Sequence, residues 1–190
     1  MSRSSLLIAA ALIAGVRGSN STVYIIRHGE KTWGGGCLNI QGQERANHLP
    51  ALFGKGGKFR TPSALFANKY NAQPDCERCW LTVQSLAQAL KLPVDFDHGY
   101  PMALGGNEAA ARAIRLTATM HSVILASWEH HNIQYLTADL GVPKSQIPSW
   151  PHDDFDTVYV VTLDASSVRT PLPHTRLRYG RLGVRRTVHF

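Results

Sequence analysis

The sequence predicts an α/β domain arranged as a three-layer sandwich, with a mainly parallel central sheet and helices on both of its faces. Two observations predict this class. Short apolar runs bounded by turn residues alternate along the chain with longer segments of helical periodicity. The chain has 190 residues, of which 44% are hydrophobic, and this length and composition suit one domain with a buried core.

Five segments have the composition of strands. Each is a continuous or alternating apolar run, and the first, fourth and fifth are rich in β-branched residues. Turn-forming residues or polar clusters separate them from the segments that follow. We expect strands at Thr22–Arg27, Ala64–Asn68, Val94–Phe96, Ser122–Trp128 and Thr157–Leu163.

Four segments between these strands have the pattern of amphipathic helices. Their apolar residues recur at three- and four-residue intervals, and alanines are frequent in the second and third. Asn107 is a candidate N-cap for the third, and Gly141 followed by Pro143 ends the fourth. We expect helices at Gln41–Phe53, Cys79–Leu90 and Asn107–Met120, and from near His131 to Gly141.

The first 18 residues resemble a secretory signal peptide. Arg3 precedes an apolar run from Leu6 to Val16, and small residues follow up to Gly18. The run is shorter than the roughly 20 residues that span a bilayer, which argues against a membrane span, while a buried N-terminal helix is the remaining alternative. The sequence therefore predicts a leader at residues 1–18, a single domain at 19–190 and a secreted protein.

An oxidising compartment gives the cysteines and one asparagine a possible role. The chain has three cysteines, which permit one disulfide and one free thiol. We expect Cys37 to pair with Cys76 or with Cys79. Asn20 lies in an Asn-Ser-Thr sequon and is a candidate glycosylation site.

The charge of the chain is uneven. The formal net charge is +7, and arginines recur after Asp164 with no acidic residue among them. Such a tail suits an anionic partner, but it is equally well explained as a solvated surface segment. Because few aromatic residues interleave with the arginines, specific nucleic-acid binding is not expected.

Histidines follow two of the predicted strands. Arg27 and His28 close the first strand, and Glu129 and His130 follow the fourth. In parallel sheets, ligands bind beyond the carboxyl ends of the strands. Arg78 stands at the start of a predicted helix, and two arginines can hold the oxygens of a phosphoryl group while a neutral imidazole attacks phosphorus.

In this arrangement the sequence resembles the histidine phosphatase superfamily, in its phosphoglycerate mutase-like branch. The segment VYIIRHGEK is similar to the Arg-His-Gly motif of that family, and NIQGQERANHLPALF to the segment that follows it. ERCWLTVQSLAQAL resembles the stretch that supplies a second arginine, with Thr82 four residues after Arg78. VILASWEHHNI resembles the strand and second histidine, and FDTVYVVTLD the late strand at the sheet edge.

The resemblance implies a role for four residues. His28 is the implied nucleophile, which forms a phosphohistidine, and Arg27, Arg78 and His130 are the implied phosphate-binding residues, with His130 also counted as catalytic. No metal and no cofactor are expected. We prefer His130 to His131 because His130 ends the strand in the register that the family motif implies. Adjacent residues of a strand point to opposite faces, so that both cannot serve equally, and the same reason argues against a metal site at this pair.

The proton donor for the leaving group is less clearly indicated. Glu108 follows a glycine-rich segment, where the family often keeps a catalytic acid, but it is also explained as an acid favoured at a helix N-terminus. Glu129 and Asp97 are competing candidates. Many relatives have serine and glycine on either side of the second histidine, where this chain has Glu129 and His131.

These observations predict a secreted, metal-independent phosphatase that hydrolyses small phosphomonoesters through His28. One alternative is an effector or binding protein that keeps the phosphate pocket with little or no turnover. Another is a phosphoglycerate mutase-type phosphotransferase, which a secreted location disfavours. The sequence indicates neither the identity of the substrate nor the oligomeric state.

Overall fold

The protein contains a five-stranded sheet whose strand order is β3-β2-β4-β1-β5. The computed structural model describes residues 20–32, 37–69, 77–99 and 106–164. β4 pairs in parallel with β1 and with β2, and β2 pairs in parallel with β3. Only the pairing of β1 with the edge strand β5 is antiparallel within this sheet. The strands are β1 (Ser21–Arg27), β2 (Ala64–Ala67), β3 (Val94–Asp95), β4 (Val123–Trp128) and β5 (Val158–Leu163).

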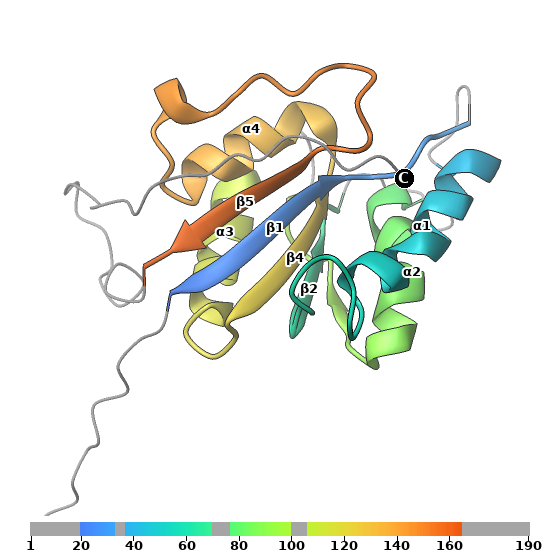
Figure 1. The fold of residues 1–190 in the computed structure, drawn as a ribbon. Helices are drawn as coiled ribbons and strands as arrows, with labels where there is room; N and C mark the ends of the chain where they lie inside the picture. The colour runs from blue at the N-terminus through green and yellow to red at the C-terminus, as the bar shows by residue number, and fades with distance from the viewer. Residues whose placement is uncertain (1–19, 33–36, 70–76, 100–105, 165–190) are drawn as a thin grey trace, which may run out of the picture.

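In the described part of the chain, four α-helices cover the two faces of the sheet, so that the expected three-layer sandwich is confirmed (Figure 1). The helices α1 (Ile40–Phe53) and α2 (Arg78–Leu90) lie together on one face. The helices α3 (Gly106–Thr117) and α4 (His130–Asp139) lie together on the other. A short 3-10 helix, η2 (Lys144–Gln146), precedes the last strand.

The sequence of β1 shows why it is an interior strand of this sandwich, covered on both faces. Val23 and Ile25 belong to the core that α3 and α4 cover. Tyr24 and Ile26, the alternate residues, belong to the core that α1 and α2 cover. Because successive strand residues point to opposite faces, an unbroken apolar run supplies both cores at once.

Some predicted boundaries differ from the observed ones. β3 has two residues rather than three, and α3 ends at Thr117 rather than Met120. Asn107, the expected N-cap of α3, is instead the second residue of that helix. Its side chain is buried and joins β4 to α4. Oδ1 accepts a hydrogen bond from Trp128 Nε1 at 2.8 Å, and Nδ2 donates one to Asn132 Oδ1 at 3.0 Å.

Two later parts of the chain lie at the carboxyl end of β1: the end of β4 and the segment between α4 and β5. Arg27, the last residue of β1, lies opposite Trp128, the last residue of the parallel strand β4. The segment between α4 and β5 then passes over this end of the sheet (Figure 1). Among the described residues, no helix is long and apolar enough to cross a membrane.

Candidate functional site

The site is built at the point where β1 ends. Arg27 is 5% exposed and His28 is 1% exposed, although both are polar. The backbone N–H of His28 donates to the carbonyl of Trp128 at 3.1 Å, which extends the β1–β4 pairing by one residue. The first strand therefore delivers both side chains into the interior at the carboxyl edge of the sheet.

Close packing of two glycines fixes the turn after His28. A Cβ on Gly29 would lie 2.8 Å from the carbonyl oxygen of Gly42 in α1. A Cβ on Gly42 would lie 2.2 Å from the carbonyl oxygen of Glu30. Since both neighbours are backbone atoms, neither position has room for a side chain. The Arg-His-Gly-Glu turn is thus held directly against the first turn of α1.

The hydrogen bonds of His28 define which ring nitrogen is available for chemistry. Nδ1 lies 2.7 Å from the carbonyl oxygen of Gly29, and it must carry the proton because a carbonyl can only accept. Nε2 accepts a hydrogen bond from Arg78 Nε at 3.0 Å. Burial, followed by the positive charge of Arg78, lowers the pKa of His28 to about 3. The imidazole is therefore neutral near pH 7, with its Nε2 lone pair unprotonated.

Arg78 reaches His28 from the first residue of α2. The Thr82 side chain, one turn further on, donates from Oγ1 to the Arg78 carbonyl at 2.7 Å and accepts from the Gly29 N–H at 2.8 Å. Arg78 is 4% exposed and Thr82 is fully buried. Thr82 thereby links the start of α2 to the turn that carries His28.

His130 and Glu129 enter the site from the start of α4. Glu129 is the N-cap, and its Oε2 accepts from the His131 N–H at 2.8 Å. Its Oε1 lies 2.7 Å from His130 Nδ1, close enough for an ion pair although the angles are not those of a hydrogen bond. Burial alone would raise the pKa of Glu129, but its interactions with His130, together with those with His131 and His28, outweigh this effect and the pKa is lowered.

The position of His130 differs from the sequence-based argument for it. We expected it to end a strand, but β4 ends at Trp128 and His130 is the first residue of α4. The rule that adjacent strand residues face opposite ways therefore does not separate it from His131. Burial does: the His130 side chain is 13% exposed, whereas His131 is exposed.

The loop of residues 151–157 holds Arg27. Arg27 Nη1 donates to the backbone carbonyls of His152 and of Asp154, the latter at 3.4 Å. The guanidinium carbon lies 3.8 Å from the centre of the Phe155 ring, in a cation-π contact. Burial lowers the pKa of Arg27 against the opposing effect of Glu129. Its Nε is buried without a hydrogen-bond partner in the described part of the chain.

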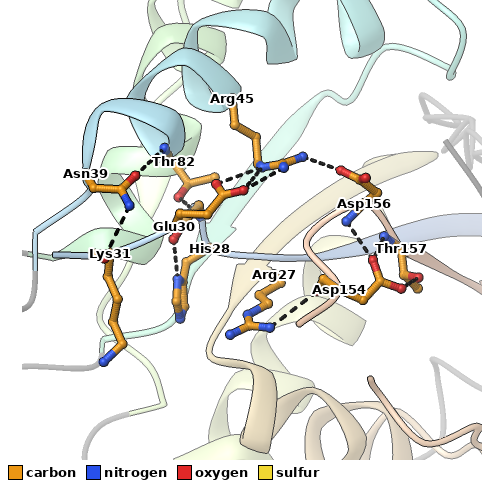
Figure 2. Close-up of polar contacts among 12 residues, drawn as sticks. Arg27, His28, Glu30, Lys31, Asn39, Arg45, Thr82, Asp154, Asp156 and Thr157 are labelled. Carbon is orange, nitrogen blue, oxygen red and sulfur yellow. Dashed lines mark hydrogen bonds and ion pairs between the residues drawn. The ribbon is translucent and has the colours of Figure 1, made fainter. Parts of the chain in front are cut away.

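The same loop is tied to α1 by Arg45. Its guanidinium makes a bidentate contact with Glu30, with Nε 3.0 Å from Oε2 and Nη2 2.7 Å from Oε1. Nη1 reaches Asp156 Oδ1 at 2.5 Å (Figure 2). Burial would raise the pKa of Glu30, but the hydrogen bonds from Arg45 hold it below its ordinary value. Arg45 therefore fastens the loop to the turn that follows His28.

Asp154 gives the loop its shape. Its Oδ1 accepts from the backbone N–H of Asp156 at 2.8 Å and of Thr157 at 3.0 Å, and its Oδ2 accepts from the Thr157 hydroxyl. The sequence-based prediction missed this loop and Arg45. The available signal was the segment HDDFD, which places three acids and a histidine directly before a predicted strand.

Of the three candidate acids, Asp97 is exposed in the segment after β3, and the other two lie in different surroundings. Glu108 is in the first turn of α3, its side chain is 64% exposed, and it pairs with Arg112 at 3.4 Å. These contacts are what a helix N-terminal acid with a partner one turn later would make. Glu129 is 2% exposed and has a carboxylate oxygen in one cluster with nitrogens of His28 and His130. The structure thus places Glu129, rather than Glu108, beside the histidines.

One of the two candidate partners of Cys37 is excluded. Cys79 is a free thiol, fully buried as the second residue of α2, and burial raises its pKa. Cys76 lies outside the described residues, so a Cys37–Cys76 disulfide stays a prediction. The leader at residues 1–18 and the basic tail after Asp164 lie outside them as well. Asn20 is exposed at the start of the described chain.

The fold of the described chain is similar to that of solved phosphatases. No family model and no curated protein matches the sequence. Among solved structures, the chain is similar to an Escherichia coli protein proposed to be an alpha-ribazole-5'-P phosphatase, with a TM-score of 0.52 and 16% identity over 74% of this chain and 90% of that one. It is also similar to the mycobacterial glucosyl-3-phosphoglycerate phosphatase solved with inorganic phosphate, with a TM-score of 0.50 and 15% identity over 74% and 89% of the two chains. These likenesses confirm the predicted fold.

Proposed function

We propose that this protein is a secreted phosphatase that hydrolyses phosphomonoesters through a phosphohistidine on His28, without a metal ion. The observation that carries the proposal is the state of His28. Its Nδ1 proton is held by the Gly29 carbonyl, and its unprotonated Nε2 faces the guanidinium of Arg78 at 3.0 Å. A neutral imidazole held beside a buried cation is an arrangement suited to attack on an anionic phosphoryl group.

In the first step, His28 Nε2 would attack phosphorus, so that an N–P bond forms while the bond to the leaving oxygen breaks. Arg78 would move its hydrogen bond from Nε2 to a phosphoryl oxygen as the substrate enters. Arg27 directly precedes His28. It could give up its hydrogen bonds to the loop carbonyls and bind a second phosphoryl oxygen instead. Two guanidinium groups would then stabilise the charge that builds on the transferring group.

The leaving oxygen needs a proton as its bond to phosphorus breaks. The Glu129–His130 pair can hold this proton between Oε1 and Nδ1, which lie 2.7 Å apart. In the second step, water would give a proton back to the pair and attack phosphorus, and cleavage of the N–P bond would release inorganic phosphate. The two steps together return His28 and the Glu129–His130 pair to their starting states.

The experiment that tests this function is hydrolysis of 4-nitrophenyl phosphate by the purified mature protein in the presence of a chelator. We expect turnover, and we expect His28→Asn to reduce it by about 10³-fold or more, because removal of a nucleophile removes the chemical route. A base-stable, acid-labile phosphoryl-enzyme should be trapped in the wild type. Wild-type inactivity over a broad panel of phosphomonoesters would refute the proposal.

A second candidate is a binding or effector protein with this pocket and little turnover. The observation that favours it is that Arg27 is already bonded to two loop carbonyls and stacked on Phe155, so that substrate must compete with these contacts. Binding of phosphate or vanadate to the wild type without turnover would support this candidate. A phosphoglycerate mutase-type transferase is the third, and transfer to an added phosphoglycerate would reveal it.

A further inference from the structure

Three potential metal ligands meet in the buried site. One ligand atom from each of His28, Glu129 and His130 lies within 4.8 Å of the other two. His28 and Glu129 are buried, at 1% and 2% exposure. Two imidazoles and one carboxylate form the ligand set that zinc often takes in proteins, with a fourth position left for water or another small ligand.

The ring nitrogens of the two histidines include atoms that could donate a lone pair to a cation. His28 Nδ1 is engaged with the Gly29 carbonyl, which leaves Nε2 as its donor atom. Both ring nitrogens of His130 are buried. Within the described part of the chain, Nδ1 lies 2.7 Å from Glu129 Oε1 without hydrogen-bond geometry, and Nε2 has no hydrogen-bond partner. Buried polar atoms without partners are uncommon in proteins and call for an explanation, of which an absent ion is one.

We propose that His28, Glu129 and His130 bind one Zn²⁺ ion, and that this ion inhibits the protein. The nitrogen that would attack phosphorus is the same nitrogen that would bind the metal. A lone pair that is donated to zinc is not available to phosphorus, so that the metal-bound form cannot form the phosphohistidine. The inhibition depends on the proposed phosphatase function, whereas the binding does not.

Two features determine the affinity of this site for zinc. Zinc bonds of about 2.0–2.1 Å place tetrahedral ligand atoms about 3.3 Å apart, so that separations up to 4.8 Å require small rotations of the side chains. Arg78 must also give up its hydrogen bond to Nε2, and its charge opposes the cation. We therefore expect reversible binding in the micromolar range, weaker than that of a structural zinc site.

The chemistry of the ligands predicts selectivity. Imidazole nitrogens suit Zn²⁺, Co²⁺ and Cu²⁺, whereas Mg²⁺ and Ca²⁺ prefer oxygen ligands. With only one carboxylate in the cluster, we expect the two alkaline-earth ions neither to bind here nor to inhibit at millimolar concentration.

The test measures binding directly. The full chain is titrated with ZnCl₂ in a calorimeter and with CoCl₂ under visible absorption, in a buffer free of phosphate. We expect a stoichiometry of one, cobalt bands of four-coordinate intensity, and at least a tenfold weaker affinity in His130→Asn and in Glu129→Gln. His131→Gln is the matched control, because its exposed ring lies beside the cluster without belonging to it, and its affinity should equal that of the wild type.

The possible results separate the two proposals. Zinc inhibition that a chelator reverses and that His131→Gln retains supports the inference. Binding without any phosphatase activity in the wild type supports the site and refutes the proposed function. The inference is overturned if zinc does not bind below 1 mM, or if folded His130→Asn and Glu129→Gln both bind it as tightly as the wild type. Thermal melts establish that each variant is folded, and His28→Asn gives a third ligand deletion should one of them fail.

Discussion

Arg78 Nε and His28 Nε2 are joined by a hydrogen bond of 3.0 Å. This contact occupies the nitrogen that the proposed reaction needs, and it does so with the group that would bind the substrate. Without ligand, Arg78 and His28 satisfy each other inside the protein, which lowers the cost of burying both. A phosphoryl group entering between them would take the place of this hydrogen bond and gain a partner on each side.

Replacement of Arg78 by lysine should therefore impair the reaction even though the positive charge is kept. Lysine lacks the planar, directional N–H groups with which arginine contacts His28 and a phosphoryl oxygen at once. We expect Arg78→Lys to lower kcat/KM for an aryl phosphate by about 10²-fold, a loss of about 3 kcal/mol of transition-state stabilisation. Steady-state kinetics measure this. Lys91→Arg, a charge-preserving change at the exposed end of α2, is the control and should have wild-type kinetics.

The proton donor can be identified by comparing two glutamates. Glu129→Gln keeps the shape of the N-cap but removes the carboxylate from the pair with His130, and we expect kcat for a poor leaving group to fall by about 10²-fold. For an activated leaving group such as 4-nitrophenolate the loss should be much smaller, because this leaving group needs little protonation.

Glu108→Gln is the matched control for this comparison. Its carboxylate is 64% exposed and paired with Arg112, so that we expect kinetics within twofold of the wild type for both leaving groups. The reverse pattern, in which kcat falls in Glu108→Gln and not in Glu129→Gln, would identify Glu108 as the proton donor.

The pKa of His28 makes the stability of the protein depend on pH. Burial and the charge of Arg78 lower this pKa from 6.5 to about 3, with Arg27 acting in the same direction and Glu129 opposing it. Between these two values the unfolded chain binds a proton that the folded protein does not, so that stability falls as the pH falls. The contribution of His28 to this loss is at most about 5 kcal/mol between pH 6.5 and 3.

Urea unfolding at a series of pH values measures this effect. His28→Asn removes the titrating group, so that the free energy of unfolding of the variant should fall less steeply than that of the wild type between pH 6.5 and 4. Parallel curves for the two proteins would mean that the imidazole is not held neutral in the folded state.

Residues that meet through local patterns were predictable from the sequence. The apolar strands, the helical periodicity and the rule that parallel strands end at one edge together bring Arg27, His28 and the segment of Glu129 and His130 to the same place. Arg78 was found through its position at the start of a helix. These inferences need only periodicity and strand direction, both of which the sequence carries.

Contacts that depend on long connections were not predictable. Residues 151–157 reach Arg27 because the chain after α4 doubles back over the sheet, and no short-range pattern specifies that path. The expected strand position of His130 was wrong for a local reason, since Glu129, the N-cap of α4, is the single residue between the end of β4 at Trp128 and the start of α4 at His130. Local preferences locate elements well and their boundaries less well.

The last prediction concerns Arg45, which joins the turn after His28 to the 151–157 loop. Its side chain is 11% exposed, and it bonds Glu30 with two nitrogens and Asp156 with a third. Arg45→Met keeps the length of the side chain but leaves the Glu30 carboxylate, also 11% exposed, without this partner. Because breaking a largely buried ion pair costs much more than losing an exposed one, we expect the free energy of unfolding to fall by about 2–4 kcal/mol.

The loop should also loosen in this variant, because Asp156 loses its anchor to α1. Arg27 would then be less firmly held at Phe155, and we expect KM for an aryl phosphate to change more than kcat. Chemical denaturation and steady-state kinetics measure the two effects. Arg112→Met is the matched control, since it removes an ion pair whose two side chains are each 64% exposed, and it should cost less than about 0.5 kcal/mol. Equal destabilisation by the two changes would show that Arg45 does not fasten the loop.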